Sequence, residues 1–310
     1  MIKIGLDLGG TKIEIIALDQ AGRELVRERA DTPRGDYHAI LDAVVKLVEN
    51  VEADLGTRCT VGIGTPGALS KKTGCLKNSN TVVMNGKPVL EDLRLRLRRE
   101  VRIANDADCF TLSEAIDGAA SGADTVFGVI LGTGVGGGVV VKGWLLSGPN
   151  AIAGEWGHNP LPWADEEDLP LPRCYCGKAG CIETFLSGPG FTAAHRSKSD
   201  TVLSAAEIVR ASLRGDPGCA LSMHQYEHRL ARSLAMVINL IDPDVIVLGG
   251  GLSNCESLYE NVPRVWRDFV FSDRVDTRLV RPKFGDSSGV RGAAWLWGNV
   301  APNIEHHKSA

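Results

Sequence analysis

The sequence lacks several features that would assign it to a whole class of proteins. No run of 18 apolar residues could span a bilayer, and the first residues, MIKIGLDLGG, lack the charged, apolar and small-residue zones of a signal peptide. With a formal net charge of −4, the sequence lacks the excess of positive charge that is typical of proteins that bind nucleic acid. The densest basic run, RLRLRRE at 94–100, alternates with leucines, as the solvated face of a helix does. We therefore expect a cytoplasmic protein with no nucleic-acid or membrane partner.

Cysteine is also scarce, except in one place. Eight cysteines occur in 310 residues, and three of them, Cys174, Cys176 and Cys181, fall within eight positions. Because stable disulfides are rare in a reducing cytosol, such a cluster more often binds metal or does redox work. The usual redox pattern, Cys-x-x-Cys before a helix, is absent. The other five are isolated and are expected to be small buried apolar groups: Cys59, Cys75, Cys109, Cys219 and Cys255.

Glycine, in contrast, is abundant, and three glycine-rich turns organise the chain. They lie within residues 2–19, 125–143 and 242–254, and a strand-like apolar run leads into each. In the first two, an extended run (IEIIAL, VVVKG) also follows the turn, whereas a Rossmann or P-loop turn opens into a helix. Both turns therefore predict hairpins, and their similarity suggests a duplicated domain.

Helix and strand patterns alternate between these turns. Residues 38–55 carry an amphipathic stripe with Asp36 as a plausible cap, and residues 60–64 are typical of a buried strand. Residues 224–241 predict a long helix that ends before an Asp-Pro pair, and GVRGAAWLWG predicts a small-residue helix packed tightly. The alternation predicts an α/β protein, and its length suits two domains, which no Pro-, Ser- or charge-rich linker separates.

The first turn, DLGGTK at 7–12, has the chemistry of a phosphate site. Glycine amides can approach phosphates closely, and Asp7 at a strand end could hold Mg²⁺ directly or through water. The alternative is a plain hairpin turn in which Asp7 and Lys12 form a salt bridge. The candidate nucleotide-binding residues of this turn are Asp7, Gly9, Gly10, Thr11 and Lys12.

The other two turns offer similar backbone. LGTGVGGG at 131–138 crowds glycines around Thr133, an arrangement that a close ligand would explain, with Gly132, Thr133 and Gly134 as candidates. The third turn, Gly249, Gly250 and Gly251, follows a buried strand, so a nucleoside could lie against bare backbone there. A simple strand-to-helix connection would explain this third turn equally well.

Six motifs occur in the order found in ROK-family sugar kinases, which the chain resembles over nearly its whole length. Its nearest likeness is to the bacterial fructokinases, also called mannofructokinases. The motifs are DLGGTK (7–12), GIGTPG (62–67), NDAD (105–108), LGTGVGGG (131–138), GEWGH (154–158) and CYCGKAGCIE (174–183). The resemblance implies a duplicated actin-like ATPase fold, related to ribonuclease H, with two α/β domains flanking a cleft. It places the domains at 1–118 and 119–289, with the helix at about 290–300 packing back on the first.

The resemblance also implies site residues. Asp106 matches the catalytic aspartate, the base that accepts the hydroxyl proton in phosphoryl transfer; from the residues alone, Asn105, Asp106 and Asp108 could instead cap a helix. Seven residues fall where such kinases contact their sugar: Gly67, Asn80, Asn105, Asp106, Glu155, His158 and Glu183. ATP and Mg²⁺ are the implied cofactors, and a homodimer is the implied assembly.

The cysteine cluster is interpreted as a structural zinc site. His158 with Cys174, Cys176 and Cys181 makes a Cys₃His set, and glycines permit a tight loop between the cysteines. Zinc on one ring nitrogen of His158 would orient the other toward a sugar hydroxyl. The pattern H-x-x-E-H at 224–228 fits inverted zinc proteases, but here it begins an amphipathic helix without a third ligand. His306 and His307, in the tail, are expected to bind nothing.

The expected function is ATP-dependent phosphorylation of a hexose at its 6-hydroxyl, with fructose as the main substrate and mannose as an additional one. The alternatives are a kinase for glucose or an N-acetylhexosamine, or a sugar-sensing transcriptional regulator of the same family. A regulator would need a DNA-binding helix-turn-helix ahead of the first motif, which begins within seven residues of Met1. The choice of fructose depends on similarity in KNSN (77–80), HNPLPW (158–163) and CYCGKAGC.

Overall fold

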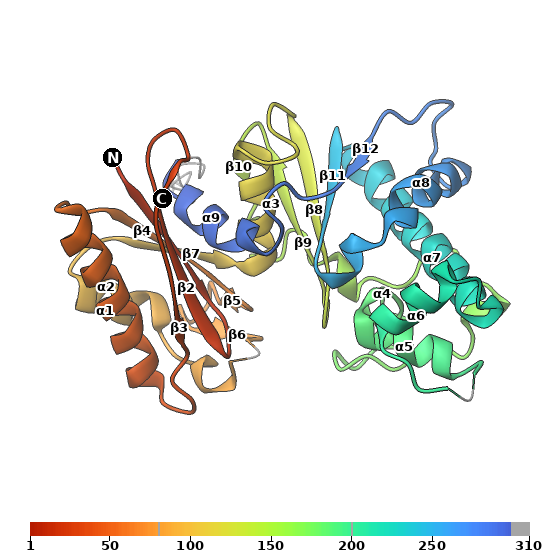
Figure 1. The fold of residues 1–310 in the computed structure, drawn as a ribbon, viewed down its shortest axis with the longest axis horizontal. Helices are drawn as coiled ribbons and strands as arrows, with labels where there is room; N and C mark the ends of the chain where they lie inside the picture. The colour runs from red at the N-terminus through yellow and green to blue at the C-terminus, as the bar shows by residue number, and fades with distance from the viewer. Residues whose placement is uncertain (80, 200, 299–310) are drawn as a thin grey trace, which may run out of the picture. The chain divides into compact units, whose positions relative to one another are not determined.

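A computed structural model describes residues 1–79, 81–199 and 201–298, and in it the chain divides into two compact units. The first unit comprises residues 1–122, 138–153 and the described residues from 287 onward, and the second comprises residues 123–137 and 154–286. The described residues form two five-stranded mixed sheets and a small hairpin (Figure 1). Nothing in the sequence pattern pointed to residues 138–153 joining the first unit.

The first sheet has the strand order β3-β2-β1-β4-β7. Strands β1, β2 and β3 pair antiparallel, whereas β1, β4 and β7 pair parallel. The carboxyl ends of the parallel strands therefore meet at one edge of the sheet. The strands are β1 (Lys3–Leu8), β2 (Lys12–Leu18), β3 (Glu24–Asp31), β4 (Thr60–Thr65) and β7 (Val101–Asn105).

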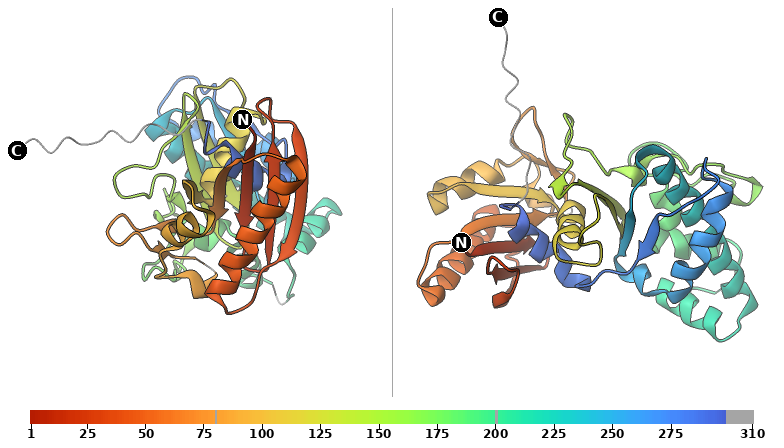
Figure 2. Two further views of the ribbon diagram at one scale, coloured as in Figure 1. Left: turned by 90° about the vertical axis from the view of Figure 1, so that its left-hand side faces the viewer. Right: turned by 90° about the horizontal axis from the view of Figure 1, so that it is seen from above.

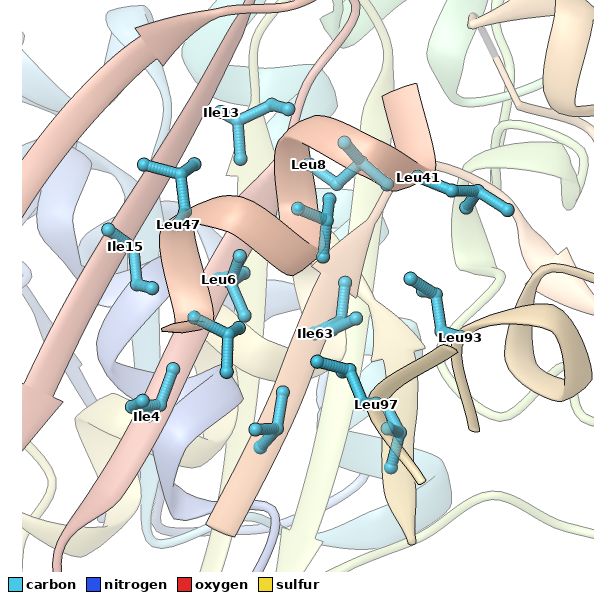
Figure 3. Packing of buried hydrophobic residues seen from close by; sticks show 14 of the residues in the cluster. Ile4, Leu6, Leu8, Ile13, Ile15, Leu41, Leu47, Ile63, Leu93 and Leu97 are labelled. Carbon is cyan, nitrogen blue, oxygen red and sulfur yellow. The ribbon is translucent and has the colours of Figure 1, made fainter. Parts of the chain in front are cut away.

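The two faces of this sheet bury different helices because successive side chains of a strand alternate between faces. Apolar side chains of β1, β2 and β4 pack against those of helix α1 (Tyr37–Leu55) and α2 (Val89–Leu97), as Figure 3 shows for Leu6, Ile63 and Leu41. Asp36 caps α1, as predicted, by accepting from the backbone N–H groups of His38 and Ala39.

The opposite face of the sheet receives helix α9 (Ser288–Trp295), which Figures 1 and 2 show across the sheet from α1. A Cβ on Gly5 of β1 would lie 2.1 Å from the carbonyl oxygen of Val290, and one on Gly62 of β4 only 1.9 Å from that of Ala293. Glycine is thus required at both positions, because backbone lies directly against backbone there. Helix α3 (Asp106–Ile116) packs beside α9, and the small hairpin pairs β5 (Ala68–Leu69) with β6 (Leu76–Lys77).

The second sheet has the order β10-β9-β8-β11-β12, with β8, β11 and β12 parallel. The first glycine turn joins β1 to β2 and the second joins β8 to β9, so each connects two neighbouring strands, as predicted from the extended runs on both sides. The strands are β8 (Thr125–Leu131), β9 (Val135–Val141), β10 (Trp144–Leu145), β11 (Val245–Gly249) and β12 (Arg278–Val280).

Helix α7 is the longest helix of the second unit, and it begins earlier than predicted. It spans Pro217–Ile241 rather than starting at residue 224, because the Asp216 side chain caps it and Pro217 occupies its first turn. None of the helices that the structure describes is long and apolar enough to cross a membrane. The other α-helices of this unit are α4 (Glu183–Leu186), α5 (Gly188–Arg196), α6 (Ala205–Leu213) and α8 (Glu256–Val265).

A buried ion-pair network fastens the loop after His158 to α7. The carboxylate of Asp168, almost wholly buried, accepts from Arg229 at 2.7 Å and from Arg232 at 2.8 Å. Both arginines lie on α7 and are themselves buried, so removing either one would leave a buried charge with one partner fewer. The network holds the segment that connects the His158 region to the cysteine loop.

Candidate active site and metal-binding loop

Two carboxylates lie close together at one edge of the first sheet. Asp7 is near the carboxyl end of β1, and Asp106 is the first residue of α3, directly after β7. Burial raises the pKa of Asp7 to about 6, and the neighbouring charges of Asp106 and Glu14 contribute to the rise. Burial also raises the pKa of Asp106, although its carboxylate accepts from the Ala107 N–H at 2.9 Å, which opposes the shift. In both carboxylates the interactions that favour the charged form do not offset the effect of burial. Such a pair can bind a cation, and one of its members can accept a proton.

Asn105 caps α3, so the cap alternative holds for this residue. Its Oδ1 accepts from the N–H groups of Ala107 at 2.7 Å and Asp108 at 3.3 Å. Its Nδ2 donates to the carbonyl of Gly67 at 3.4 Å. Three predicted sugar-binding residues, Gly67, Asn105 and Asp106, are therefore brought together within the first unit, whereas Asn80 lies outside the described residues.

Backbone conformation and close packing require glycine at position 67. Its φ is +90°, and a Cβ there would lie 2.4 Å from the Lys77 carbonyl oxygen and 2.8 Å from the Ser79 nitrogen. The turn after β4 is therefore packed directly against the segment 77–79 that follows the small hairpin. The Asn85 side chain holds that segment by accepting from the Ser79 N–H at 2.9 Å and donating to its carbonyl at 2.8 Å.

The first glycine turn is closed by its own backbone and by Thr32. The Gly9 N–H donates to the Lys12 carbonyl at 3.0 Å, and Thr32 bonds the carbonyls of Gly9 and Thr11 at 2.8 and 3.0 Å. Gly10 and the side chains of Thr11 and Lys12 are exposed. In the described structure Asp7 and Lys12 form no ion pair; Glu14, opposite Asp7 across the sheet, instead pairs with Arg27 and Arg29.

The second glycine turn is tied to Glu183, another predicted sugar contact. One carboxylate oxygen of Glu183 accepts from the Val135 N–H at 2.9 Å. A Cβ on Gly134 would lie 2.7 Å from that same oxygen, so the glycine makes room for the carboxylate. The Gly132 N–H closes the turn on the Gly134 carbonyl at 3.0 Å, and Thr133 at the tip is exposed.

At one position of the third glycine turn, close packing explains why the residue is glycine. Gly250 has φ +80°, and a Cβ there would lie 2.5 Å from the carbonyl oxygen of Leu131 at the end of β8. A Cβ on Gly251 would meet nothing within 4 Å. The alternative of a strand-to-helix connection thus accounts for Gly250, and Gly251 leaves open space beside the chain.

His158 and the three clustered cysteines converge on one point. The four ligand atoms all lie within 4.8 Å of one another; the His158 Nδ1 is 3.7 Å from the Cys174 Sγ, and the Cys176 Sγ is 3.6 Å from the Cys181 Sγ. Zn–S bonds of about 2.3 Å at tetrahedral angles put sulfur atoms about 3.8 Å apart. The observed spacings fit a tetrahedral Cys₃His site, and all eight cysteines, each within the described residues, are free thiols.

Backbone hydrogen bonds hold the loops that supply these ligands. The Leu161 N–H donates to Gly180 at 2.8 Å, and the Ile182 N–H donates to Asn159 at 2.9 Å, so the segment after His158 runs antiparallel beside the segment that carries Cys181. Within the tight loop the Cys174 N–H donates to the Lys178 carbonyl at 2.8 Å. The site joins segments more than 15 residues apart in the chain.

The second ring nitrogen of His158 has a partner that the sequence did not predict. Its Nε2 lies 3.0 Å from the hydroxyl of Tyr175, and the two rings are perpendicular at a centroid distance of 5.2 Å. Glu155, the third acidic sugar-binding candidate, precedes the short helix that ends at His158 and is exposed. No periodicity could have signalled Tyr175; the only clue was its place between two ligand cysteines.

The H-x-x-E-H stretch is part of α7 and is arranged for packing. The carboxylate of Glu227 is buried and accepts from the side chains of Ser257 and Asn261, while the rings of His224 and His228 lie 5.0 Å apart. In the described part of the chain, only the cysteine cluster brings three or more potential metal-ligating side chains together. The two tail histidines, His306 and His307, are outside the described residues.

Comparison with known proteins extends over nearly the whole chain. The ROK family model matches residues 3–300. The chain is 40% identical over 296 residues to an N-acetyl-D-glucosamine kinase of Photobacterium profundum and 41% identical over 300 residues to one of Salmonella newport. Each alignment covers 94% of this chain and 98% of the relative.

Solved structures support the fold. The chain is similar to a ROK hexokinase from Thermus thermophilus, with a TM-score of 0.85, 31% identity, and coverage of 95% of this chain and 97% of the other. It is also similar to a ROK glucokinase from Streptomyces griseus, solved with glucose and AMPPNP, with a TM-score of 0.75, 26% identity, and coverage of 96% and 99%. The predicted α/β fold of the actin-like ATPase type is confirmed.

Proposed function

The chain belongs to the ROK family and is an ATP-dependent sugar kinase, and we propose that its substrate is an N-acetylhexosamine, with N-acetyl-D-glucosamine preferred. The observation that supports this choice is 40–41% identity, over nearly the full length of both chains, to N-acetyl-D-glucosamine kinases. These relatives do not support the fructose preference expected from the sequence; they favour the alternative stated with it. The reaction is transfer of the γ-phosphoryl group of ATP to the sugar 6-hydroxyl.

Asp106 is the general base of the proposed reaction. Its raised pKa makes its carboxylate a better proton acceptor than an exposed aspartate, and its position at the start of α3 is held by the Ala107 N–H. Transfer of the hydroxyl proton to Asp106 accompanies attack of the sugar oxygen on the γ-phosphorus, with ADP as the leaving group. Gly67 and Asn105, which bond each other, lie beside it and contact the sugar.

Four further residues are proposed, from the family resemblance, to contact sugar hydroxyls: Asn80, Glu155, His158 and Glu183. Glu183 reaches this role already fixed on one side, because one of its oxygens accepts from Val135. A carboxylate held in place loses less conformational entropy when it binds a ligand.

The glycine turns bind ATP. Exposed backbone at Gly10 and Thr11, with the charge of Lys12, receives phosphate oxygens, as does the turn at Gly132, Thr133 and Gly134. The open space beside Gly251, in the turn 249–251, receives the nucleoside. Mg²⁺ would be held by Asp7, directly or through water, and would neutralise phosphate charge.

Zinc in the Cys₃His site is structural. His158, Cys174, Cys176 and Cys181 would supply all four ligands of a tetrahedral zinc ion, which would leave no position for water or substrate. The bound metal would cross-link the loop of His158 to the loop of Cys181, two residues before Glu183. We also propose, from the family resemblance, a homodimer in the cytoplasm.

A panel of hexoses tests the proposed substrate. Purified protein with ATP and Mg²⁺ is assayed against N-acetyl-D-glucosamine, N-acetyl-D-mannosamine, glucose, mannose and fructose, with kcat/KM as the measure. We expect N-acetyl-D-glucosamine to lead by at least about tenfold. Fructose is the second candidate, because the stretches KNSN, HNPLPW and CYCGKAGC favour it. A tenfold lead for fructose would reverse the assignment, and the Asp106→Asn variant serves as the inactive control.

A further inference from the structure

The loop between His158 and Cys174 has one buried anchor, and that anchor is charged. In residues 162–173 only Asp168 is buried, with 4% of its surface exposed, and only Pro162 and Pro172 are half-buried. A loop is ordinarily fastened to a protein by apolar side chains, but the leucines of this one, at 169 and 171, are exposed. The position of the loop therefore depends on the carboxylate of Asp168 and its partners.

Two arginines of α7 hold this carboxylate and the backbone beside it. Asp168 accepts from the Nε of Arg229 at 2.7 Å and from Arg232 at 2.8 Å. The same arginines donate to main-chain carbonyls of the loop, Arg229 to that of Glu167 at 3.4 Å and Arg232 to that of Trp163. Because the donors of a guanidinium lie in one rigid plane, these contacts fix the orientation of the loop as well as its distance from α7.

Arg229 has a further contact, on α4. Its guanidinium carbon lies 5.1 Å from the centroid of the Phe185 ring, within the range of a cation–π interaction. One turn earlier on α7, the hydroxyl of the buried Tyr226 donates to the Leu186 carbonyl at 2.9 Å. Helix α4 has four residues and begins at Glu183, and so short a helix is stable only through its packing. These contacts with α7 therefore help to place Glu183.

Arg229 thus contacts both segments, whereas the contacts of Arg232 described above are with the loop alone. We infer that Arg229 is a positioning residue of the sugar site, which holds the loop after His158 and the helix that begins at Glu183 in fixed places on α7. Its effect on the sugar rests on the proposed function, in which Glu183 contacts a sugar hydroxyl. Its fastening of the two segments does not depend on the identity of any substrate.

Arg229→Lys tests both parts, because lysine keeps the charge that Asp168 needs and lacks the planar group. We expect the KM for the sugar that leads the hexose panel to rise about tenfold, with kcat and the KM for ATP within about twofold of wild type. A merely structural role would lower the fraction of folded enzyme, which reduces kcat and leaves KM unchanged. Hydrogen exchange followed by mass spectrometry, without substrate, should be about tenfold faster in residues 162–173 and 183–187.

Phe185→Leu separates the two segments, because it removes the ring and leaves the contacts of Asp168 in place. Exchange should accelerate in 183–187 and stay at the wild-type rate in 162–173. In the double variant the effects of Arg229→Lys and Phe185→Leu on 183–187 should not add, since either change removes the same contact. Additive effects would overturn the link from Arg229 to α4. If Arg229→Lys does not fold, a wild-type sugar KM in Phe185→Leu would overturn the inference.

Arg99→Lys is the matched control. Arg99 donates to the Glu52 carboxylate at 2.7 Å in a partly buried ion pair of the first unit, so the same chemical change should alter neither the sugar KM nor exchange in the two segments. A wild-type sugar KM in folded Arg229→Lys, or an equal rise in Arg99→Lys, would overturn the positioning role. If no sugar is phosphorylated but exchange accelerates in both segments, the proposed function fails and the fastening by Arg229 stands.

Discussion

Replacing Asp7 by asparagine should stabilise the metal-free protein at neutral and alkaline pH. Asp7 is half-buried at the sheet edge near Asp106, and its pKa rises from 3.8 to about 6 on folding. Between these two values the native state binds more protons than the unfolded state, so the free energy of unfolding falls as pH rises. The penalty for ionising Asp7 is small below pH 3.8 and complete above about pH 7.

The size of the effect follows from the shift. The rise in the pKa of Asp7 corresponds to a penalty of about 3 kcal/mol for ionising this residue in the folded protein at pH 8. At pH 4.5 the same two pKa values leave a penalty of about 1 kcal/mol. Asparagine has nearly the same shape and carries no charge, so Asp7→Asn should avoid this penalty. The free energy of unfolding of the variant should therefore exceed that of wild type at both pH values, and the difference should be about 2 kcal/mol larger at pH 8 than at pH 4.5.

Urea unfolding followed by circular dichroism, in EDTA at both pH values, measures this difference. Asp54→Asn is the control, because Asp54 is an exposed aspartate near the C-terminal end of α1, far from the N-cap Asp36. Equal stability of Asp7→Asn and wild type at both pH values, or a wild type that is more stable at pH 8, would contradict the proposed environment of Asp7. Mg²⁺ with ATP should raise the stability of wild type more than that of the variant, because the asparagine lacks the charge that holds the cation.

Three further changes test the proposed site. Asp106→Asn should lower kcat about 10²–10⁴-fold, whereas sugar binding measured by calorimetry should stay intact. Turnover within about tenfold of wild type would remove Asp106 as the base. In wild type, kcat/KM should fall as the pH drops below the raised pKa of Asp106. Cys176→Ser should lose bound zinc in elemental analysis and weaken sugar binding or folding, whereas full zinc content would refute its role as a ligand. Gly134→Ala should push the Glu183 carboxylate away, because the new Cβ would lie 2.7 Å from one of its oxygens. The sugar KM should then rise roughly tenfold or more while the zinc content stays unchanged. An unchanged KM would rule out Glu183 as a sugar contact.

Local patterns in the sequence predicted much of the fold. The apolar stripe and the Asp36 cap defined α1 within a residue, because cap and stripe lie within one segment. The zinc ligands could be grouped for a similar reason: three of the four lie in one tight loop. The start of α7 was missed although Asp216 and Pro217 are ordinary start signals, because the apolar periodicity becomes clear only at residue 224.

Features that depend on distant contacts could not be predicted. Gly250 looked like a ligand-facing glycine, but its neighbour is the carbonyl of Leu131, more than a hundred positions earlier. The hydrogen bond between His158 and Tyr175 depends on a side-chain rotamer, which leaves no trace in residue periodicity. The substrate is the clearest case, because the motifs shared by hexose kinases describe the 6-hydroxyl chemistry and not the rest of the sugar ring.

The packing of α9 against Gly5 and Gly62 has a consequence for biosynthesis. Strands β1 and β4 emerge early from the ribosome, whereas the helix that covers one of their faces ends at Trp295. At roughly 5–20 residues per second, about 9 to 35 seconds separate residue 122 from the end of that helix. During this interval the nascent first unit presents an uncovered sheet face, which is the kind of surface that chaperones bind.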